Sequence, residues 1–216
     1  KLQYIHLPAL KQYEGEFNLD WSVSTDSVVL SKIAEKTHIH NSLIIKPEKC
    51  FSLESSHSIQ ILILDIATEI PMGCFTERKQ LQFVSCQQVQ IIRAKAFQQC
   101  NSLRKVKSKS LQIIKCRGFS GCLKLSQIDL DNVVELQSDA FFNCNCLVQL
   151  KMNKLKSIPQ SCFEFCPSLR QIIADKLENV DQRAFGFQCS NVNIVCKNDL
   201  TPFGWKKCKE EKLQEA

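Results

Sequence analysis

The sequence predicts a solenoid in which short parallel β-strands stack along one axis, and two observations carry that prediction. Phenylalanines recur every 22 residues without a slip from residue 75 to residue 185, and other apolar residues keep fixed distances from them. No repeat contains the roughly 10–12 residues of helical periodicity that a helix would show. Because one such unit is too small to bury its own apolar face, identical units must stack and share a core.

The phenylalanine column sets the phase of every other element. Phe51 precedes the regular series by 24 residues, so the first copy is displaced relative to the others. The regular members are Phe75, Phe97, Phe119, Phe141, Phe163 and Phe185. A small residue precedes each ring, namely Cys50, Cys74, Ala96, Gly118, Ala140, Cys162 and Ala184.

A strand is expected nine residues after each phenylalanine. Leucine stands six residues on and Val, Ile or Leu nine on, and this spacing suits a short strand followed by a turn. Further apolar columns at 14 and 17 residues complete the core. We expect parallel strands about 4.8 Å apart. They lie around residues 83–85, 105–107, 127–129, 149–151, 171–173 and 193–195.

The 13 cysteines fall into two groups. Nine occupy phases where other copies place small or apolar residues, and we predict that they are buried: Cys50, Cys74, Cys86, Cys100, Cys122, Cys144, Cys162, Cys166 and Cys196. Parallel columns point neighbouring thiols alike, which favours a reduced ladder and leaves disulfides as the alternative. The repeat does not explain Cys116, Cys146, Cys189 and Cys208, which are the candidates for reaction or pairing.

The repeat pattern Leu-x-x-Ile-x-Leu, Leu-x-x-Ile, Ala-Phe-x-x-Cys-x-x-Leu resembles the BspA-type leucine-rich repeat over residues 51–196. That family includes surface antigens and adhesins. The resemblance implies an α/β-type, right-handed leucine-rich-repeat solenoid of about seven to nine units, with short parallel strands, turns or short 3-10 segments, and little α-helix. We expect the solenoid to span residues 1–200, with divergent repeats or an insertion in 1–50, and a C-terminal cap and polar tail at 201–216.

The motifs of catalysis and metal binding are absent from the sequence. It has no Gly-x-Ser-x-Gly, no phosphate-cradling glycine loop and no His-Glu-x-x-His. Cys144-x-Cys146 and His38-x-His40 each offer two ligands, whereas structural zinc takes about four. The longest apolar run, Ile61–Leu64, is far below the ~18–20 residues of a membrane span. We therefore predict no enzyme activity, cofactor, metal or membrane span in this segment, which begins at Lys1 and so is expected to be part of a longer protein.

Basic residues concentrate in the central repeats. Residues 78–128 contain 11 Lys and Arg and no Asp or Glu. Arg93 and Lys115 share one phase, and Lys95 and Arg117 share another, so stacking should form a four-cation patch. Like charges on neighbouring strands destabilise a sheet, which is consistent with a partner that supplies counter-charge, while a solvated surface that keeps the chain soluble is the alternative. Nucleic acid is disfavoured because no aromatic residues interleave the run; an acidic protein or an anionic glycan fits better.

Side chains on either side of the ninth position should project from the concave sheet and form a protein-binding face. The predicted binding residues are Phe83, Lys105, Lys107, Gln127, Asp129, Gln149, Lys151, Gln171 and Ile173. Within this face, Gln127, Gln149, Gln171 and Asn193 form a column of amides. Stacked amides either bond one another as a structural ladder or offer donors and acceptors to a ligand.

These features predict a non-catalytic protein-interaction module. The apparently unpaired cysteines favour an intracellular scaffold or structural subunit. A cell-surface adhesin or antigen is the alternative that the family resemblance implies. A third hypothesis is the targeting arm of an enzyme whose catalytic domain lies outside these residues. The sequence leaves the partner's identity, the compartment and the oligomeric state open.

Overall fold

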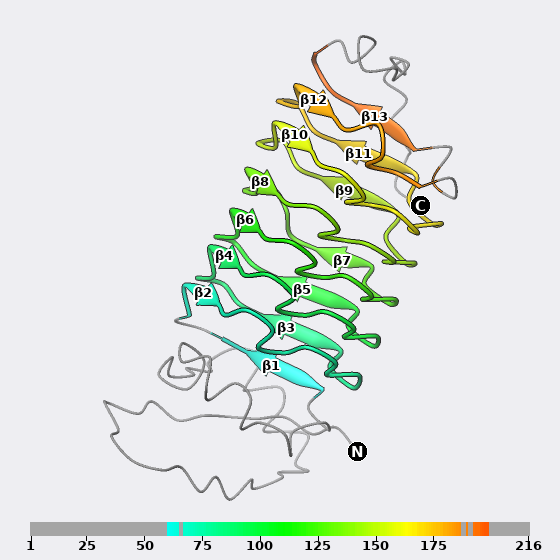
Figure 1. Cartoon of the computed structure of the whole chain (residues 1–216). Coiled ribbons are helices and arrows are strands. Elements are labelled where there is room, and N and C mark those ends of the chain that lie inside the picture. Colours follow the sequence, from blue (N-terminus) through cyan, green and yellow to red (C-terminus); the bar gives the residue numbers. More distant parts are fainter. Residues whose placement is uncertain (1–59, 65–66, 187–188, 190–191, 199–216) are drawn as a thin grey trace, which may run out of the picture.

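The chain folds into a solenoid of two parallel strand columns, and the computed structural model describes residues 60–64, 67–186, 189 and 192–198 (Figure 1). Strands of two or three residues alternate between the columns along the chain. The odd-numbered strands are β1 (Ile61–Ile63), β3 (Phe83–Ser85), β5 (Lys105–Lys107), β7 (Gln127–Ile128), β9 (Gln149–Lys151), β11 (Gln171–Ile173) and β13 (Asn193–Val195). The even-numbered strands are β2 (Glu69–Ile70), β4 (Ile91–Ile92), β6 (Ile113–Ile114), β8 (Glu135–Leu136), β10 (Ser157–Ile158) and β12 (Asn179–Val180).

Each strand pairs in parallel with the strand 22 residues away, as the repeat predicts. Val84 lies beside Leu62 on one side and Val106 on the other. The fold class is thereby confirmed, and the strands around the ninth position are where the sequence places them, with β7 ending one residue early. The even-numbered column was not predicted. The expected divergent segment 1–50 and cap 201–216 lie outside the described residues.

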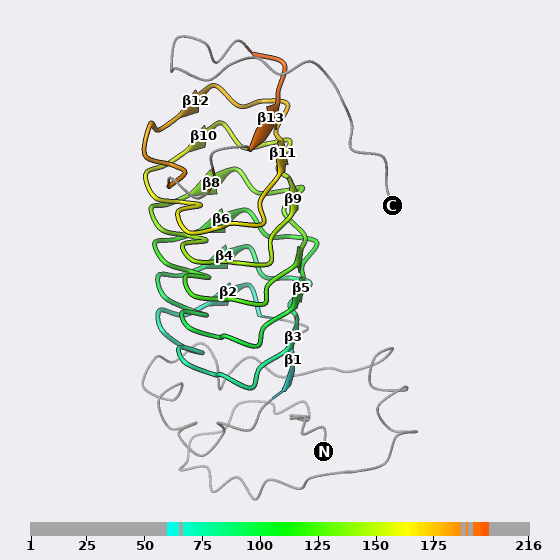
Figure 2. The same ribbon diagram turned by 90° about the vertical axis from the view of Figure 1, so that its right-hand side faces the viewer.

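A stack of phenylalanine rings forms the axis of the core, on the side away from the odd-numbered strands (Figure 2). Consecutive rings from Phe75 to Phe185 have centroids 5.3–5.6 Å apart and planes within 15° of parallel. The rings from Phe75 to Phe163 are almost completely buried. The leucine and isoleucine columns fill the space between this stack and the strands.

The turn around each of these phenylalanines has a left-handed residue two positions before and two positions after the ring. Around Phe97 these are Lys95 and Gln99, both with φ of 59°. The amides of all three residues donate to carbonyls of the next turn, at 2.9, 2.8 and 2.7 Å for Lys95, Phe97 and Gln99. Left-handed backbone costs a non-glycine residue about 1–2 kcal/mol. The hydrogen bonds to the next turn help to offset this cost.

A ladder of cysteines runs beside the phenylalanine stack. The Cys122 thiol donates to the Phe97 carbonyl at 3.2 Å, and Cys100, Cys144 and Cys166 repeat the bond at 3.0–3.2 Å. All 11 cysteines within the described residues are unpaired, which confirms the reduced ladder over that part of the chain. Burial raises the pKa of Cys100 and of Cys166 to about 12. These thiols therefore stay protonated and unreactive at neutral pH.

Two cysteine predictions were wrong. Cys189, which the repeat did not explain, is buried and donates to the Phe163 carbonyl at 3.2 Å. It continues the ladder although it stands four residues after Phe185 instead of three, so the ladder tolerates a slip of one residue. Cys196 is half exposed, at the end of the last described strand. Cys50 and Cys208 lie outside the described residues.

Both strand columns are interrupted at the same level. The ladders run β1-β3-β5-β7 and β2-β4-β6-β8, and resume as β9-β11-β13 and β10-β12. Before the break, the Gln137 amide donates to the Ile114 carbonyl at 3.0 Å. Pro159 occupies that phase in the next unit and has no N–H to give to Leu136. On the far side of the core the stack continues, with the Phe119 and Phe141 rings 5.5 Å apart.

We expect the amides at this break to exchange hydrogen fastest within the strands. The Arg170 and Gln171 amides both donate to the Val148 carbonyl, whereas Val148 and Gln149 have no backbone acceptor within the described residues. One missing hydrogen bond predicts exchange about 10-fold faster at Val148 and Gln149. Hydrogen exchange resolved to single amides checks this. Equal protection at the two pairs would contradict a real break in the sheet.

Candidate protein-binding face

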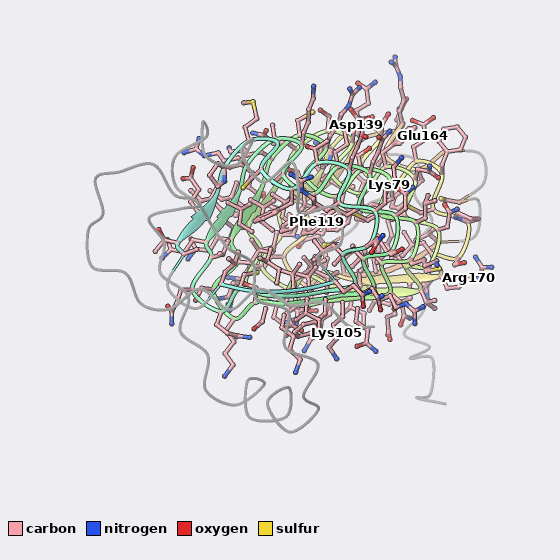
Figure 3. All side chains as sticks on the ribbon, turned by 90° about the horizontal axis from the view of Figure 1, so that it is seen from below. Lys79, Lys105, Phe119, Asp139, Glu164 and Arg170 are labelled. Carbon is pink, nitrogen blue, oxygen red and sulfur yellow. The ribbon has the colours of Figure 1, made fainter. Side chains whose placement is uncertain are left out.

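The outward side chains of the odd-numbered strands form one continuous surface, which we call the sheet face. In β5, Val106 is buried while Lys105 and Lys107 point outward, as the alternation of a strand requires. Lys105 projects from the side of the molecule opposite Lys79 and Asp139, with Phe119 between them in the core (Figure 3). The predicted binding residues Phe83, Gln127, Asp129, Gln149, Lys151, Gln171 and Ile173 all come from this strand column or the residue next to it.

The centre of the sheet face is basic. Four cations, here called the β5 cluster, come from one turn: Arg104, Lys105, Lys107 and Lys109. None of the four has an ion pair within the described part of the chain. The neighbouring Asp129 carboxylate instead accepts the Ser108 amide, at 3.2 Å. Three of the cations are exposed and Lys105 is half buried, so the turn presents uncompensated positive charge to solvent.

The amide column is only partly available to a ligand. The Gln149 side-chain amide donates to the Gln171 side-chain carbonyl at 2.7 Å. Gln171 was predicted to project from the face, but its side chain is completely buried. Gln127 lies across the break between β7 and β9 and does not extend this bond. The column therefore acts as a structural ladder over one step, from Gln149 to Gln171, and exposes Gln127 alone as a free amide.

The four-cation patch receives its counter-charge from neighbouring turns. Arg93 binds Glu69 through two hydrogen bonds, of 2.6 and 2.9 Å, and the carboxylate raises the pKa of the Arg93 guanidinium. The hydrogen bond from Lys115 to Glu135, at 2.8 Å, lowers the pKa of that carboxyl group. Anion binding at this patch stays a prediction, because three of its four cations are already paired.

The third ion pair of the patch joins Arg117 to Asp139 at 3.4 Å, which leaves Lys95 without an ion pair within the described residues. These acidic partners were missed in the sequence because they lie 20–24 residues from the basic ones instead of in phase with them. Glu69 and Glu135 share one phase, immediately outside the acid-free run at 78–128. That shared phase was the signal that could have identified them.

Other chemically reactive candidates are not brought together. Cys146 is exposed, and Cys116 is half buried with its sulfur 3.6 Å from the Ser138 hydroxyl. Across the described ranges, no three His, Cys, Asp or Glu side chains are grouped as metal ligands would be. The predicted two-ligand pair His38 and His40 lies outside those ranges. The same part of the chain holds no helix of the length and apolarity that crossing a bilayer requires.

Comparison with known families agrees with this geometry. The BspA type Leucine rich repeat region matches in 6 copies, over residues 28–104 and 68–193. The chain belongs to the BspA-type leucine-rich repeat family. No curated protein matches its sequence.

Several solved structures share the leucine-rich repeat fold. A leucine rich cell surface protein from Faecalibacterium prausnitzii A2-165 is 20% identical, with a TM-score of 0.53 over 65% of this chain and 48% of that one. A T. pallidum Leucine Rich Repeat protein is 20% identical, with a TM-score of 0.50 over 56% of this chain and 68% of that one. A leucine-rich repeat protein from Bacteroides ovatus ATCC 8483 is 14% identical, with a TM-score of 0.50 over 63% of this chain and 45% of that one. The match thus spans about half the length of the first and third structures.

Proposed function

We propose that this leucine-rich repeat protein is a non-catalytic protein-binding module, and that its sheet face takes an acidic surface of a partner protein. The observation that supports this most is the β5 cluster, because four cations on one turn carry no ion pair among the described residues. Charges that a protein does not compensate internally attract oppositely charged partners and speed association. Extended solenoid faces are surfaces through which repeat proteins bind other proteins.

The apolar part of the same face supports a protein partner over a simple anion. Phe83 lies directly beside Lys105 in the parallel register and is half exposed. Ile173 and Val195 add partly exposed apolar side chains in β11 and β13. Aromatic side chains surrounded by polar and basic residues are the usual anchors of protein interfaces. The four-cation patch is the weaker candidate, since carboxylates already occupy most of it.

A charge-reversal variant tests the β5 cluster. We expect Lys105→Glu/Lys107→Glu to weaken binding of the partner by 10-fold or more at low salt, and to flatten the dependence of the affinity on salt. The measurement is a titration of the partner isolated with the parent chain. Lys124→Glu/Lys176→Glu is the matched control, because both lysines are exposed, lie off the sheet face and change the net charge equally. Equal losses in the two variants would assign the effect to net charge and not to the sheet face.

The compartment is proposed on the same chemistry. Unpaired thiols throughout the described core favour a reducing interior and therefore a scaffold or structural subunit. A cell-surface location is the second candidate, which the printed name of the Faecalibacterium protein favours. Labelling of intact cells with a membrane-impermeant amine reagent separates the two. Modified peptides containing Lys107 would place the repeats outside, and modification only by a permeant reagent would place them inside.

A further inference from the structure

A hollow of about 530 Å³ opens on the phenylalanine-turn side of the solenoid, away from the sheet face. Figure 3 shows two of its lining residues, Lys79 and Asp139, on the side opposite Lys105. Gly121 creates the space. In the adjacent turns the same phase carries the side chains of Gln99 and Asn143, whereas Gly121 contributes none. We call this space the Gly121 hollow.

The polar lining of the Gly121 hollow can both donate and accept hydrogen bonds. The amides of Gln98, Gln99 and Asn143 and the hydroxyl of Ser120 face it, and each of these groups does both. With its amide oriented to satisfy its neighbours, Asn101 donates to the carbonyls of Gln99 and Gly121, at 3.0 Å each. That pair of bonds fixes the backbone on one side of the space. Groups of this kind match the hydroxyls of a carbohydrate, which also donate and accept.

The apolar lining supplies a flat surface. Phe142 lines the hollow and is held in place by an edge-on contact with Phe165, at 5.2 Å between ring centroids. Leu123 lies at the same phase as Lys79 and Asn101 and adds a second apolar wall. A sugar ring has an apolar face of C–H groups that packs on an aromatic ring while its hydroxyls meet polar groups. The volume lies within the ~300–1,000 Å³ of small-molecule sites and holds about one or two such rings.

The charges of the hollow select an acidic ligand. Arg117 and Asp139 form an ion pair at 3.4 Å and largely compensate each other. Lys79 has no ion pair within the described residues and leaves the hollow with one surplus positive charge. We propose that the Gly121 hollow binds a sugar residue that carries one carboxylate, a uronic or sialic acid, with the carboxylate on Lys79 and the ring on Phe142. This site is separate from the sheet face, so the two proposals stand or fall independently.

Ligand-observed NMR with the parent chain tests this, using glucuronic acid, N-acetylneuraminic acid and neutral glucose at equal millimolar concentrations. We expect saturation transfer to at least one acidic sugar, and an affinity for it at least 10-fold higher than for glucose. Transfer to none of them would overturn the proposal. Equal transfer to glucose would overturn the selection of a carboxylate.

Variants locate the binding site. Gly121→Asn restores the side chain that the next turn carries at this phase, and asparagine tolerates a positive φ, so it should fill the hollow and weaken binding by 10-fold or more. Lys79→Gln should remove the preference for acidic sugars without affecting the fold, because the side chain is exposed. Lys124→Gln is the control and should change neither. Unchanged binding in both test variants would overturn the site, as would equal loss in Lys105→Glu/Lys107→Glu, which leaves the hollow intact.

Discussion

A Phe119→Ala variant is expected to lose about 3–5 kcal/mol of its free energy of unfolding. The Phe119 ring is completely buried, and its centroid lies 5.3 Å from that of Phe97 and 5.5 Å from that of Phe141. The change removes the transfer energy of the ring, leaves a cavity and breaks two stacking contacts of about 0.5–1.5 kcal/mol each. Because every turn is stabilised by its neighbours, the loss spreads to both adjoining turns.

Urea unfolding followed by circular dichroism measures this loss. Phe83→Ala is the matched control, since it removes the same ring from the half-exposed sheet face and should cost about 1 kcal/mol. If the two variants lost equal stability, the phenylalanine stack would not be the axis of the core. Ordinary unfolding cooperativity in the parent is needed to compare the two midpoints.

The second large effect is a steep loss of stability in alkali. Burial raises the pKa of Cys86, Cys100 and Cys166 from the ordinary 9.0 to about 12. The unfolded chain therefore releases these protons at lower pH than the folded chain. Their contribution is complete below pH 9 and is lost as the pH rises from about 9 to about 12. By pH 10 each thiol costs about 1.4 kcal/mol, so the three together cost about 4 kcal/mol.

The alkaline loss is measured as the free energy of unfolding between pH 7 and pH 10.5 under reducing conditions. Cys86→Ala should shallow the slope by one thiol, and alanine already occupies the same phase at Ala174. Cys146→Ala should leave the slope unchanged, because its thiol is exposed. A parent chain whose stability did not fall above pH 9, or a Cys86→Ala variant with the parent's slope, would show that these thiols do not titrate as buried groups.

The sequence predicted those parts of the fold that side-chain periodicity encodes. The strands at the ninth position, the phenylalanine stack and the cysteine ladder all place one residue type at one phase. Backbone conformation leaves no comparable signal, so the even-numbered strands and the left-handed turns were missed; at most turns a residue other than glycine takes the positive φ. The break at Pro159 was in the sequence as a proline at a hydrogen-bonding phase, but its consequence appears only when adjacent turns are aligned.

The candidate site divides in the same way. The outward positions of Lys105 and Lys107 follow from strand alternation and were predicted. The pairing of Arg93 with Glu69 depends on side-chain reach across turns, and the burial of Gln171 depends on its packing, so neither follows from phase alone. The Gly121 hollow was visible as a glycine in a column of larger residues, although only the structure shows what lines it.

Photo-cross-linking from the sheet face tests the central claim of protein binding most directly. A photoreactive amino acid at Ser85, which lies beside Lys107 in the register of β3 and β5, leaves the β5 cluster intact. The same probe at Lys124, which is exposed and off the sheet face, serves as the comparison. The account predicts one cross-linked protein partner from position 85 and none from position 124. The same partner captured equally from position 124, or no partner from position 85 in cells that contain it, would contradict the sheet face as the binding surface.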